Sequence, residues 1–210
     1  MTIAITGATG QLGRLALAAV QARAPEAAIV ALARNPAADL GVPVRAFDYT
    51  KAETLAPALA GIKTLVLISS NDFNDRAGQH RAVIDAAKAA GVGRIIYTSI
   101  LKGDASPMLL AADHIATEAY LKASGLAVTL LRNGWYTENY TGSLAGSVAH
   151  GALIGASGEG RIASAARADY AEAIAVAALD EAHAGKTYEL AGDLPHSIAD
   201  FAAEVSRQVG

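Results

Sequence analysis

A glycine-rich segment near the N-terminus has the spacing of a phosphate-binding loop. It reads Thr6-Gly7-Ala8-Thr9-Gly10-Gln11-Leu12-Gly13, between a strand-like run and a helix-like one. In a GxxGxxG pattern the first glycine permits a tight turn, the second lets a pyrophosphate approach the backbone, and the third lets helix and strand pack closely. Phosphates would bind the free N–H groups and the positive dipole end of the helix. The spacing therefore predicts a dinucleotide site at Gly7, Ala8, Thr9, Gly10, Gln11, Leu12 and Gly13, the alternative being a tight turn without a ligand.

An arginine ends the second strand-like run, where dinucleotide sites usually have an acidic residue that binds the ribose. The segment reads Ala31-Leu32-Ala33-Arg34-Asn35-Pro36. A guanidinium offers a planar set of donors and attracts phosphate, so Arg34 favours the 2′-phosphate of NADP over the free hydroxyl of NAD. The alternative is a solvated loop arginine.

Polar residues also follow the third and fourth strand-like runs. Asp48 could accept a hydrogen bond from the adenine amino group, or instead cap the helix that begins near Lys51. Ser69, Ser70 and Asn71 lie where open parallel sheets bind ligands, although turn formation alone would also explain them.

These segments are positioned by an alternation of short apolar runs and longer alanine-rich stretches of helical period. This alternation predicts an α/β fold with a Rossmann-like, doubly wound parallel sheet. The expected strands are Ile3–Thr6, Ala28–Ala33, Val44–Phe47, Thr64–Ile68, Arg94–Thr98 and Ala127–Leu131. The expected buried helix positions are Leu12, Leu15, Ala16, Ala19 and Val20, and then Val83, Ile84 and Ala87 in a helix that Gly91 ends.

After residue 132 the alternation loosens into a glycine-rich, polar segment. Beyond it come helix-like Asp169–Leu179, strand-like Thr187–Leu190 and helix-like Ser197–Gln208. We expect residues 1–132 to form an NADP-binding core. We expect residues 133–210 to add the remaining sheet edge and a small C-terminal substrate lobe, within one structural domain.

Composition argues against several other classes of protein. Seventeen basic and twenty acidic side chains give a net charge of −3, which offers no positive potential for nucleic acid or an anionic membrane. Without cysteine, and with five scattered histidines, we expect no disulfide, no iron–sulfur cluster and no metal site. No apolar run approaches the ~20 residues of a spanning helix, and no charged leader precedes the first strand, so we expect an unprocessed cytoplasmic protein.

Longer motifs resemble a known family. IAITGATGQLG, ALARNP, LISS, QHRAVIDAAKAAGV, RIIYTS, LRNGWYTENY, IASAARADY and YELAGD are similar to the NmrA-like branch of atypical short-chain dehydrogenase/reductases. They spread from Ile3 to Asp193. GATGQLG and ARNP belong to the wider branch, which includes triphenylmethane reductases. NGWYTENY and IASAARADY are more specific and resemble bacterial NAD(P)H:quinone oxidoreductases of type 2.

The resemblance implies a flavin-free and metal-free enzyme that binds NADPH and passes hydride directly to a small-molecule quinone. It assigns the cofactor to the glycine loop, Arg34 and residues 69–71. Near the nicotinamide end it implies Asn133, Gly134, Trp135, Tyr136, Thr137, Glu138 and Ser164. Trp135 and Tyr136 could stack on a ring, or be core or rim aromatics that need no ligand.

One departure from the family pattern concerns catalysis. Ordinary short-chain dehydrogenases carry a Tyr-x-x-x-Lys pair where this chain has His114 and Glu118. A quinone needs less help from a positioned acid, because the hydroquinone anion is aromatic. The candidate catalytic residues are His114, Tyr136 and Asn133, with His114 donating a proton near neutral pH or a hydrogen bond to the substrate carbonyl. A surface His114–Glu118 pair is the alternative. Tyr97 and Ser99 lie near the same cleft, and we expect Tyr97 to pack rather than act as an acid.

A second departure concerns length. Relatives of this type continue past a position like Gly210, so we expect a shortened substrate lobe. Two other functions stay open: a non-catalytic NADP(H)-sensing regulator of the NmrA-like type, and a reductase of another conjugated acceptor such as a triphenylmethane dye. A homodimer is possible, and the sequence fixes neither the oligomer nor the physiological quinone.

Overall fold

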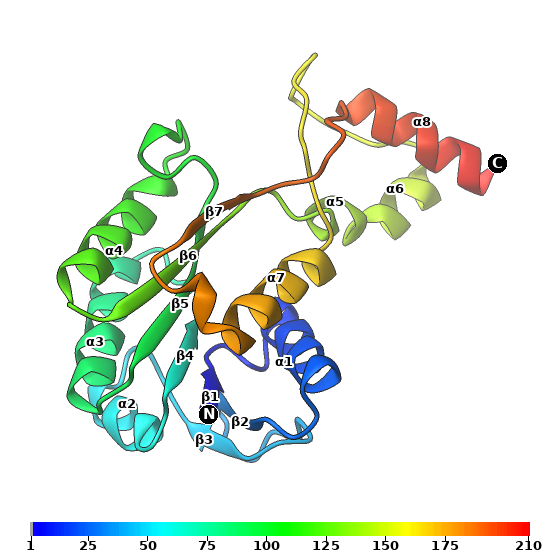
Figure 1. Ribbon diagram of the computed structural model, residues 1–210. Helices are drawn as coiled ribbons and strands as arrows, with labels where there is room; N and C mark the ends of the chain where they lie inside the picture. Colours follow the sequence, from blue (N-terminus) through cyan, green and yellow to red (C-terminus); the bar gives the residue numbers. More distant parts are fainter. Residues whose placement is uncertain (1) are drawn as a thin grey trace.

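A computed structural model describes residues 2–210 as a seven-stranded sheet with helices on both faces (Figure 1). Every strand pairs in parallel, in the order β3-β2-β1-β4-β5-β6-β7. The strands are β1 Thr2–Ile5, β2 Ala28–Ala33, β3 Val44–Ala46, β4 Thr64–Leu67, β5 Arg94–Ile100, β6 Ala127–Asn133 and β7 Thr187–Leu190. The expected doubly wound, Rossmann-like sheet is confirmed.

The helices divide between the two faces of the sheet. They are α1 Gln11–Arg23, α2 Ala52–Leu59, α3 Arg76–Ala89, α4 Ala111–Ala123, α5 Glu138–Thr141, α6 Leu144–His150, α7 Arg167–Leu179 and α8 Ile198–Val209. Figure 1 shows α2, α3 and α4 on one face and α1 with α7 on the other. Two short 3₁₀ turns, Gly103–Ala105 and Glu181–His183, complete the elements of the described residues.

Each face has its own apolar core. Ile3 and Ile5 point toward α1 and α7, whereas Ala4 between them belongs to the core under α2, α3 and α4, as the two-residue period of a strand requires. The predicted stripe of α1 is wrong at one position, because Leu15 is 37% exposed and Leu17 is buried in its place. Because α7 packs beside α1 on the same face of the sheet, a broader face of α1 is buried than contact with the sheet alone would bury.

The strand order reverses next to β1, since β2 and β3 lie on one side of it and β4 to β7 on the other. In doubly wound sheets this switch point, at the carboxyl ends of the strands, is where ligands bind. Here the Thr6 hydroxyl accepts a hydrogen bond from the Ile68 N–H at 2.9 Å. The Tyr49 hydroxyl lies 2.6 Å from the Thr6 hydroxyl and 2.7 Å from the Ile68 carbonyl oxygen. The ends of β1 and β4 are therefore tied together directly below the glycine loop.

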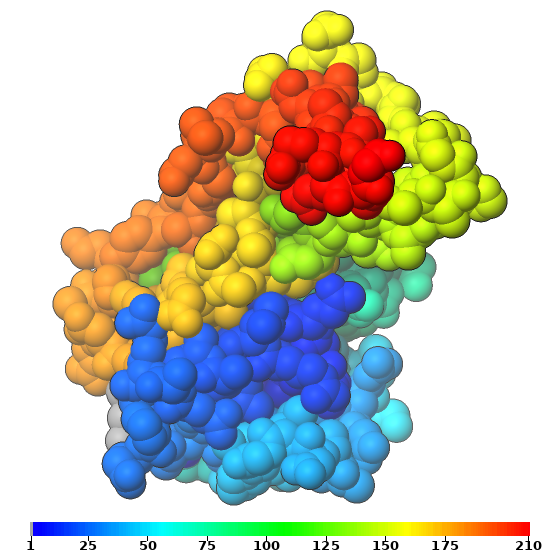
Figure 2. Space-filling model, turned by 90° about the vertical axis from the view of Figure 1, so that its right-hand side faces the viewer, coloured from blue at the N-terminus to red at the C-terminus, as the bar shows by residue number. Residues whose placement is uncertain are grey.

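The C-terminal segments gather at this same end of the molecule. Figure 2 shows the yellow-green residues of α6 and the red residues of α8 above the dark blue residues near the start of α1. The sequence does not predict the short helices α5 and α6, because segments of four and seven residues are too short to show a clear helical period. The start of α8 fits its sequence, since Ser197 and Asp200 form a reciprocal capping box. No helix within residues 2–210 is long and apolar enough to cross a membrane.

Candidate cofactor and substrate site

The glycine loop connects β1 to α1 at the switch point. Gly7 has a φ of +59°, a left-handed conformation that glycine adopts without strain, and its carbonyl accepts a hydrogen bond from the Gly10 N–H at 2.8 Å. The Ala8 N–H is bonded to the Leu32 carbonyl of β2, which fixes the loop to the neighbouring strand. Because the first N–H groups of a helix have no intrahelical partner, the start of α1 presents donors at this edge.

The third glycine of the motif packs against the loop itself. A Cβ on Gly13 would lie 2.8 Å from the Cα of Ala8, closer than real side chains approach, and would also overlap the Gly7 carbonyl. The sequence-based expectation that this glycine allows close approach is thus met sterically, although the contact is between helix and loop rather than helix and strand. A larger residue would push α1 away from the turn that it completes.

Arg34 and Asp48 come together beyond the loop, at the ends of β2 and β3. Hydrogen bonds from the Thr50 backbone N–H and hydroxyl lower the pKa of Asp48, and the nearby charges of Lys51 and Arg34 lower it further. Asp48 does not cap α2, whose preceding residue is Lys51, so the capping alternative is wrong. Arg34 is exposed, which leaves its guanidinium accessible to a ligand.

The segment after β4 carries the three predicted polar residues but gives them different environments. Asn71 is exposed and Ser69 is half-buried, with its N–H bonded to the Thr98 hydroxyl at 2.9 Å. Ser70 is buried, its N–H donates to His80 Nε2 at 3.0 Å, and its carbonyl accepts from Arg76 Nε at 2.7 Å. Ser70 is therefore held by the protein, Ser69 is partly accessible, and Asn71 is exposed.

Residues 133–138 leave the end of β6 and run beside Ser164. The Thr137 N–H donates to the Ala165 carbonyl, and the Thr137 hydroxyl donates to Ser164 Oγ at 3.0 Å. Gly134 passes close to β7, since a Cβ there would lie 3.1 Å from the Leu190 carbonyl oxygen. The carboxylate of Glu138 accepts the Arg167 N–H at 2.9 and 3.0 Å and so holds the first turn of α7.

The predicted residues at the end of β6 include an acceptor without a partner. Asn133 is 6% exposed, its Nδ2 makes a long 3.4 Å contact to the Tyr136 hydroxyl, and its Oδ1 is enclosed with no hydrogen bond among the described residues. The Tyr136 ring packs edge-on against Tyr170 and lies 4.5 Å below the Arg167 guanidinium. Trp135 is 40% exposed and so is not a core residue.

His114 and Glu118 are not a surface pair. They are 6% and 3% exposed, and they contact different partners. His114 Nδ1 lies 2.8 Å from the Tyr97 hydroxyl. Glu118 accepts from Ser99 at 2.6 Å and from Arg132 at 2.9 and 2.7 Å. The expectation of a surface i, i+4 pair is wrong, because the alanine-rich sequence of α4 does not reveal which face is buried.

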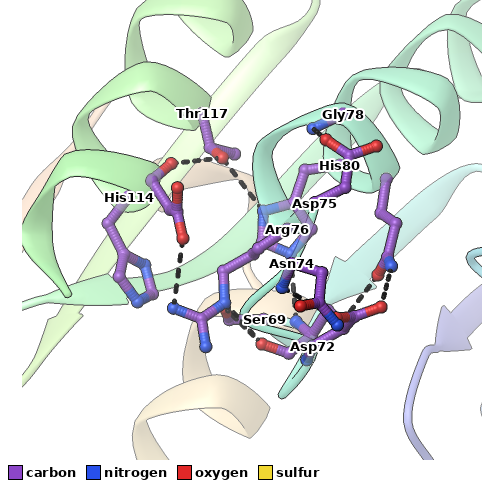
Figure 3. A network of polar contacts seen from close by, with 12 residues as sticks. Ser69, Asp72, Asn74, Asp75, Arg76, Gly78, His80, His114 and Thr117 are labelled. Atoms are coloured by element: carbon purple, nitrogen blue, oxygen red, sulfur yellow. Dashed lines mark hydrogen bonds and ion pairs between the residues drawn. The ribbon is translucent and has the colours of Figure 1, made fainter.

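The expected titration of His114 near neutrality is also wrong. Burial and the charge of Arg76 lower its pKa to about 4, against the opposing charge of Glu118. Tyr97 is fully enclosed as expected, but its hydroxyl bonds to His114 rather than serving packing alone. Figure 3 shows the Arg76 guanidinium between His114 and Ser69.

Sequence reasoning missed Arg76 and His80. Both are buried on the first turns of α3, four residues apart, directly after the predicted Ser69–Asn71 segment. The i, i+4 spacing of an arginine and a histidine at the start of a helix that follows a switch-point strand was the available signal. No group of three or more His, Asp or Glu residues in the described part of the chain is placed to hold a metal ion.

Comparisons with known proteins agree with this geometry. The profile of a family described as NAD(P)H-binding matches residues 7–181. Quinone oxidoreductase 2 of Escherichia coli (strain K12) is 51% identical over 213 residues, covering 99% of this chain and 74% of that protein. The crystal structure of NADPH-dependent quinone oxidoreductase from E. coli complexed with NADPH matches with a TM-score of 0.92 at 51% identity, over 98% of this chain and 75% of that one. Triphenylmethane reductase of Citrobacter sp., complexed with NADP(H), matches at 36% identity with a TM-score of 0.95, over 100% of this chain and 76% of that one.

Proposed function

Because the chain belongs to the NAD(P)H-binding family, we propose that it is an NADPH-dependent oxidoreductase that reduces quinones. The observation that carries the proposal is the glycine loop at the switch point with Arg34 beside it, in a chain half identical to an E. coli quinone oxidoreductase. Switch-point loops of this kind bind the pyrophosphate of a dinucleotide at the start of the first helix.

The residues of the site fit NADPH on three observations. Gly13 lets α1 begin against the loop, so its first N–H groups can reach a pyrophosphate. Arg34 is exposed at the end of β2, where it would pair with the 2′-phosphate, with Asp48 beside it for the adenosine. The enclosed Asn133 Oδ1 finds no donor in the described part of the chain, and the carboxamide NH₂ of nicotinamide would supply one.

When bound, NADPH supplies a hydride, which carries the two electrons that turn a quinone into a hydroquinone anion, and one proton completes the product. We expect the hydride to pass directly to the quinone, without a flavin. On the protein side, Asn133, Gly134 and Trp135 to Glu138, with Ser164, would hold the nicotinamide end. Tyr136, with its ring fixed between Tyr170 and Arg167, would border the substrate. We further propose a cytoplasmic location and a quinone as the only partner that the site requires.

The first experiment follows NADPH oxidation by the purified chain with 1,4-benzoquinone, with NADH in parallel. In Arg34→Ala we expect the KM for NADPH to rise about tenfold and the KM for NADH to stay unchanged, because only NADPH carries the phosphate. The matched control is Arg81→Ala, an exposed arginine on α3 outside the site. If the chain consumes no NADPH with any simple quinone, the proposal is wrong. Tight binding of NADPH without turnover would favour a non-catalytic sensor.

A further inference from the structure

We propose that His114 acts as a neutral hydrogen-bond donor, with its proton on Nε2, toward the carbonyl oxygen of the hydride acceptor. Four residues fix it in that form and are positioning residues: Ser70, His80, Tyr97 and Arg76. The inference rests on the proposed quinone reduction and assigns the group that meets the negative charge developing on the substrate oxygen.

His80 is fully enclosed and lies at the inner end of the hydrogen-bond chain. Its Nε2 accepts the Ser70 N–H at 3.0 Å and therefore carries no hydrogen. Burial, followed by the charges of His114 and Arg76, lowers the pKa of His80 to about 3, so the ring is neutral and its hydrogen is on Nδ1. That nitrogen lies 2.9 Å from the Thr117 hydroxyl, whose own hydrogen goes to the Asp113 carbonyl. The backbone amide of Ser70 thus sets the tautomer of His80.

The tautomer of His80 determines the direction of the next hydrogen bond. The Tyr97 hydroxyl lies 3.4 Å from His80 Nδ1 and 2.8 Å from His114 Nδ1. His80 Nδ1 already carries a hydrogen and cannot accept, so we place the Tyr97 hydrogen on the contact to His114 Nδ1, which at 2.8 Å is shorter than the contact to His80. Burial raises the pKa of Tyr97, so this hydroxyl keeps its hydrogen at neutral pH. The neutral ring of His114 must then carry its own hydrogen on Nε2.

The Nε2 atom of His114 is the free end of this chain. Among the described residues, His114 Nε2 has no hydrogen-bond partner. It also does not belong to the unpaired polar atoms that are fully enclosed, so Nε2 lies in the small exposed part of the residue. A donor that the protein leaves unpaired is available to a substrate oxygen, and Arg76 lies between this histidine and the Ser69–Asn71 segment at the switch point.

Arg76 keeps His114 neutral by its position. The guanidinium is 4% exposed, its Nε donates to the Ser70 carbonyl at 2.7 Å, and one Nη is enclosed without a hydrogen bond, 3.8 Å from Asp113 Oδ2. A second positive charge on the adjacent imidazole would be repelled at short range in a poorly solvated place. The other titratable groups around His114 are His80 on α3, Tyr97 on β5, and Asp113 and Glu118 on its own helix, where Arg132 neutralises Glu118.

A neutral donor suits the balance of the reaction. The hydride brings both electrons to the quinone, one oxygen becomes negative, and the nicotinamide becomes oxidised. His114 Nε2–H stabilises that oxygen through a hydrogen bond and keeps its hydrogen, so the final proton of the hydroquinone comes from solvent. No change of protonation state in His114 is needed to begin the next turnover.

The first test reads the imidazole nitrogens of the ¹⁵N-labelled protein by NMR between about pH 5 and pH 8. His114→Gln and His80→Gln identify the two signals. We expect His114 with hydrogen on Nε2 and His80 with hydrogen on Nδ1, neither titrating in this range. A protonated His114 at pH 6, or hydrogen on its Nδ1, would overturn the inference whatever the enzyme reduces.

The second test measures kcat/KM and its pH profile with 1,4-benzoquinone. Tyr97→Phe removes the hydroxyl but keeps the ring, and we expect kcat/KM to fall about 10- to 100-fold because the His114 tautomer is no longer fixed. Arg76→Gln should raise the pKa of His114 in the NMR titration and make kcat/KM depend on pH in the same range. Arg76→Lys keeps the positive charge, so both changes should be much smaller in that variant.

Arg81→Gln serves as the control, since this exposed arginine lies on the same helix as Arg76 and should leave both readouts unchanged. If the wild-type chain reduces quinones but Tyr97→Phe and Arg76→Gln change neither the profile nor the tautomer, the inference fails and the proposed function stands. If the wild-type chain reduces no quinone while the NMR tautomers are as expected, the proposed function fails and the hydrogen-bond chain stands without a substrate.

Discussion

Glu118 and Arg132 form a buried two-point ion pair between α4 and β6. Arg132 Nε donates to Oε1 at 2.9 Å and a terminal nitrogen donates to Oε2 at 2.7 Å, while the Ser99 hydroxyl donates to Oε1 at 2.6 Å. Glu118 occupies the place of the lysine in the usual short-chain pair. The ion pair holds the Glu118 carboxylate inside the protein and so links α4 to the sheet, whereas His114, one turn earlier on α4, contacts the Tyr97 hydroxyl of β5 instead.

Replacing Glu118 by Gln should destabilise the protein strongly. The Arg132 guanidinium, 15% exposed, would keep only the exposed Glu189 as a charged partner. Removing one member of a buried pair leaves the other charge uncompensated, and we expect the free energy of unfolding to fall by about 3 kcal/mol in urea titrations. The control is Glu172→Gln, whose carboxylate pairs with Arg23 on the surface and should cost less than about 1 kcal/mol. Equal losses in the two variants would contradict the buried role.

The same pair predicts a pH dependence of stability. Burial raises the pKa of Glu118, but hydrogen bonds from Arg132 and Ser99 outweigh burial and hold the pKa below its usual value. A carboxyl whose pKa is lowered in the folded state contributes stability that is present above the unfolded pKa of about 4.3 and is lost as pH falls through the folded value. The difference in unfolding free energy between wild type and Glu118→Gln should therefore shrink below about pH 4. A difference that stays constant down to acid pH would show that the charge of Glu118 contributes nothing.

Gly13→Ala tests the glycine loop. A Cβ there would lie 2.8 Å from the Ala8 Cα, so α1 must shift and the donors at its start must move away from the phosphate position. We expect NADPH to bind at least tenfold more weakly by fluorescence titration, with an unfolding free energy lower by about 1–3 kcal/mol.

Gly146→Ala is the matched control, because this helical glycine of α6 has open space around it. It should leave NADPH binding unchanged and raise stability by up to about 1 kcal/mol. Unchanged NADPH affinity in Gly13→Ala would argue against the loop as the cofactor site.

The sequence predicts the sheet well because its strands are short, apolar and separated by clear helical stretches. The glycine loop and Arg34 follow from local spacing, and both lie where a doubly wound sheet binds ligands. The buried face of α4 could not be predicted in the same way, since alanines spread along this helix blur its apolar stripe. Their partners Tyr97 and Arg132 come from neighbouring strands, so only the parallel register of β5 and β6 brings them together. The i, i+4 spacing of Arg76 and His80 marks them as candidates, but it does not predict their partners, which come from the segment after β4, from β5 and from α4.

Asn133→Leu should separate the stability of the site from its ability to bind the cofactor. Within residues 2–210, Asn133 Oδ1 is enclosed without a donor, and Nδ2 has only the long contact to Tyr136. Replacing an unsatisfied buried polar group by an apolar one of similar size is close to neutral, so the free energy of unfolding without NADPH should change by less than about 1 kcal/mol.

With NADPH at a hundred times its dissociation constant, the free energy of unfolding of the wild type should rise by about 2.7 kcal/mol. The variant should gain about 1.4 kcal/mol less for each tenfold loss of affinity, because the carboxamide loses its acceptor. Thermal unfolding with and without NADPH measures both quantities. A variant that is destabilised alone but gains as much from NADPH as the wild type would show that Asn133 is a structural residue and that the nicotinamide binds elsewhere.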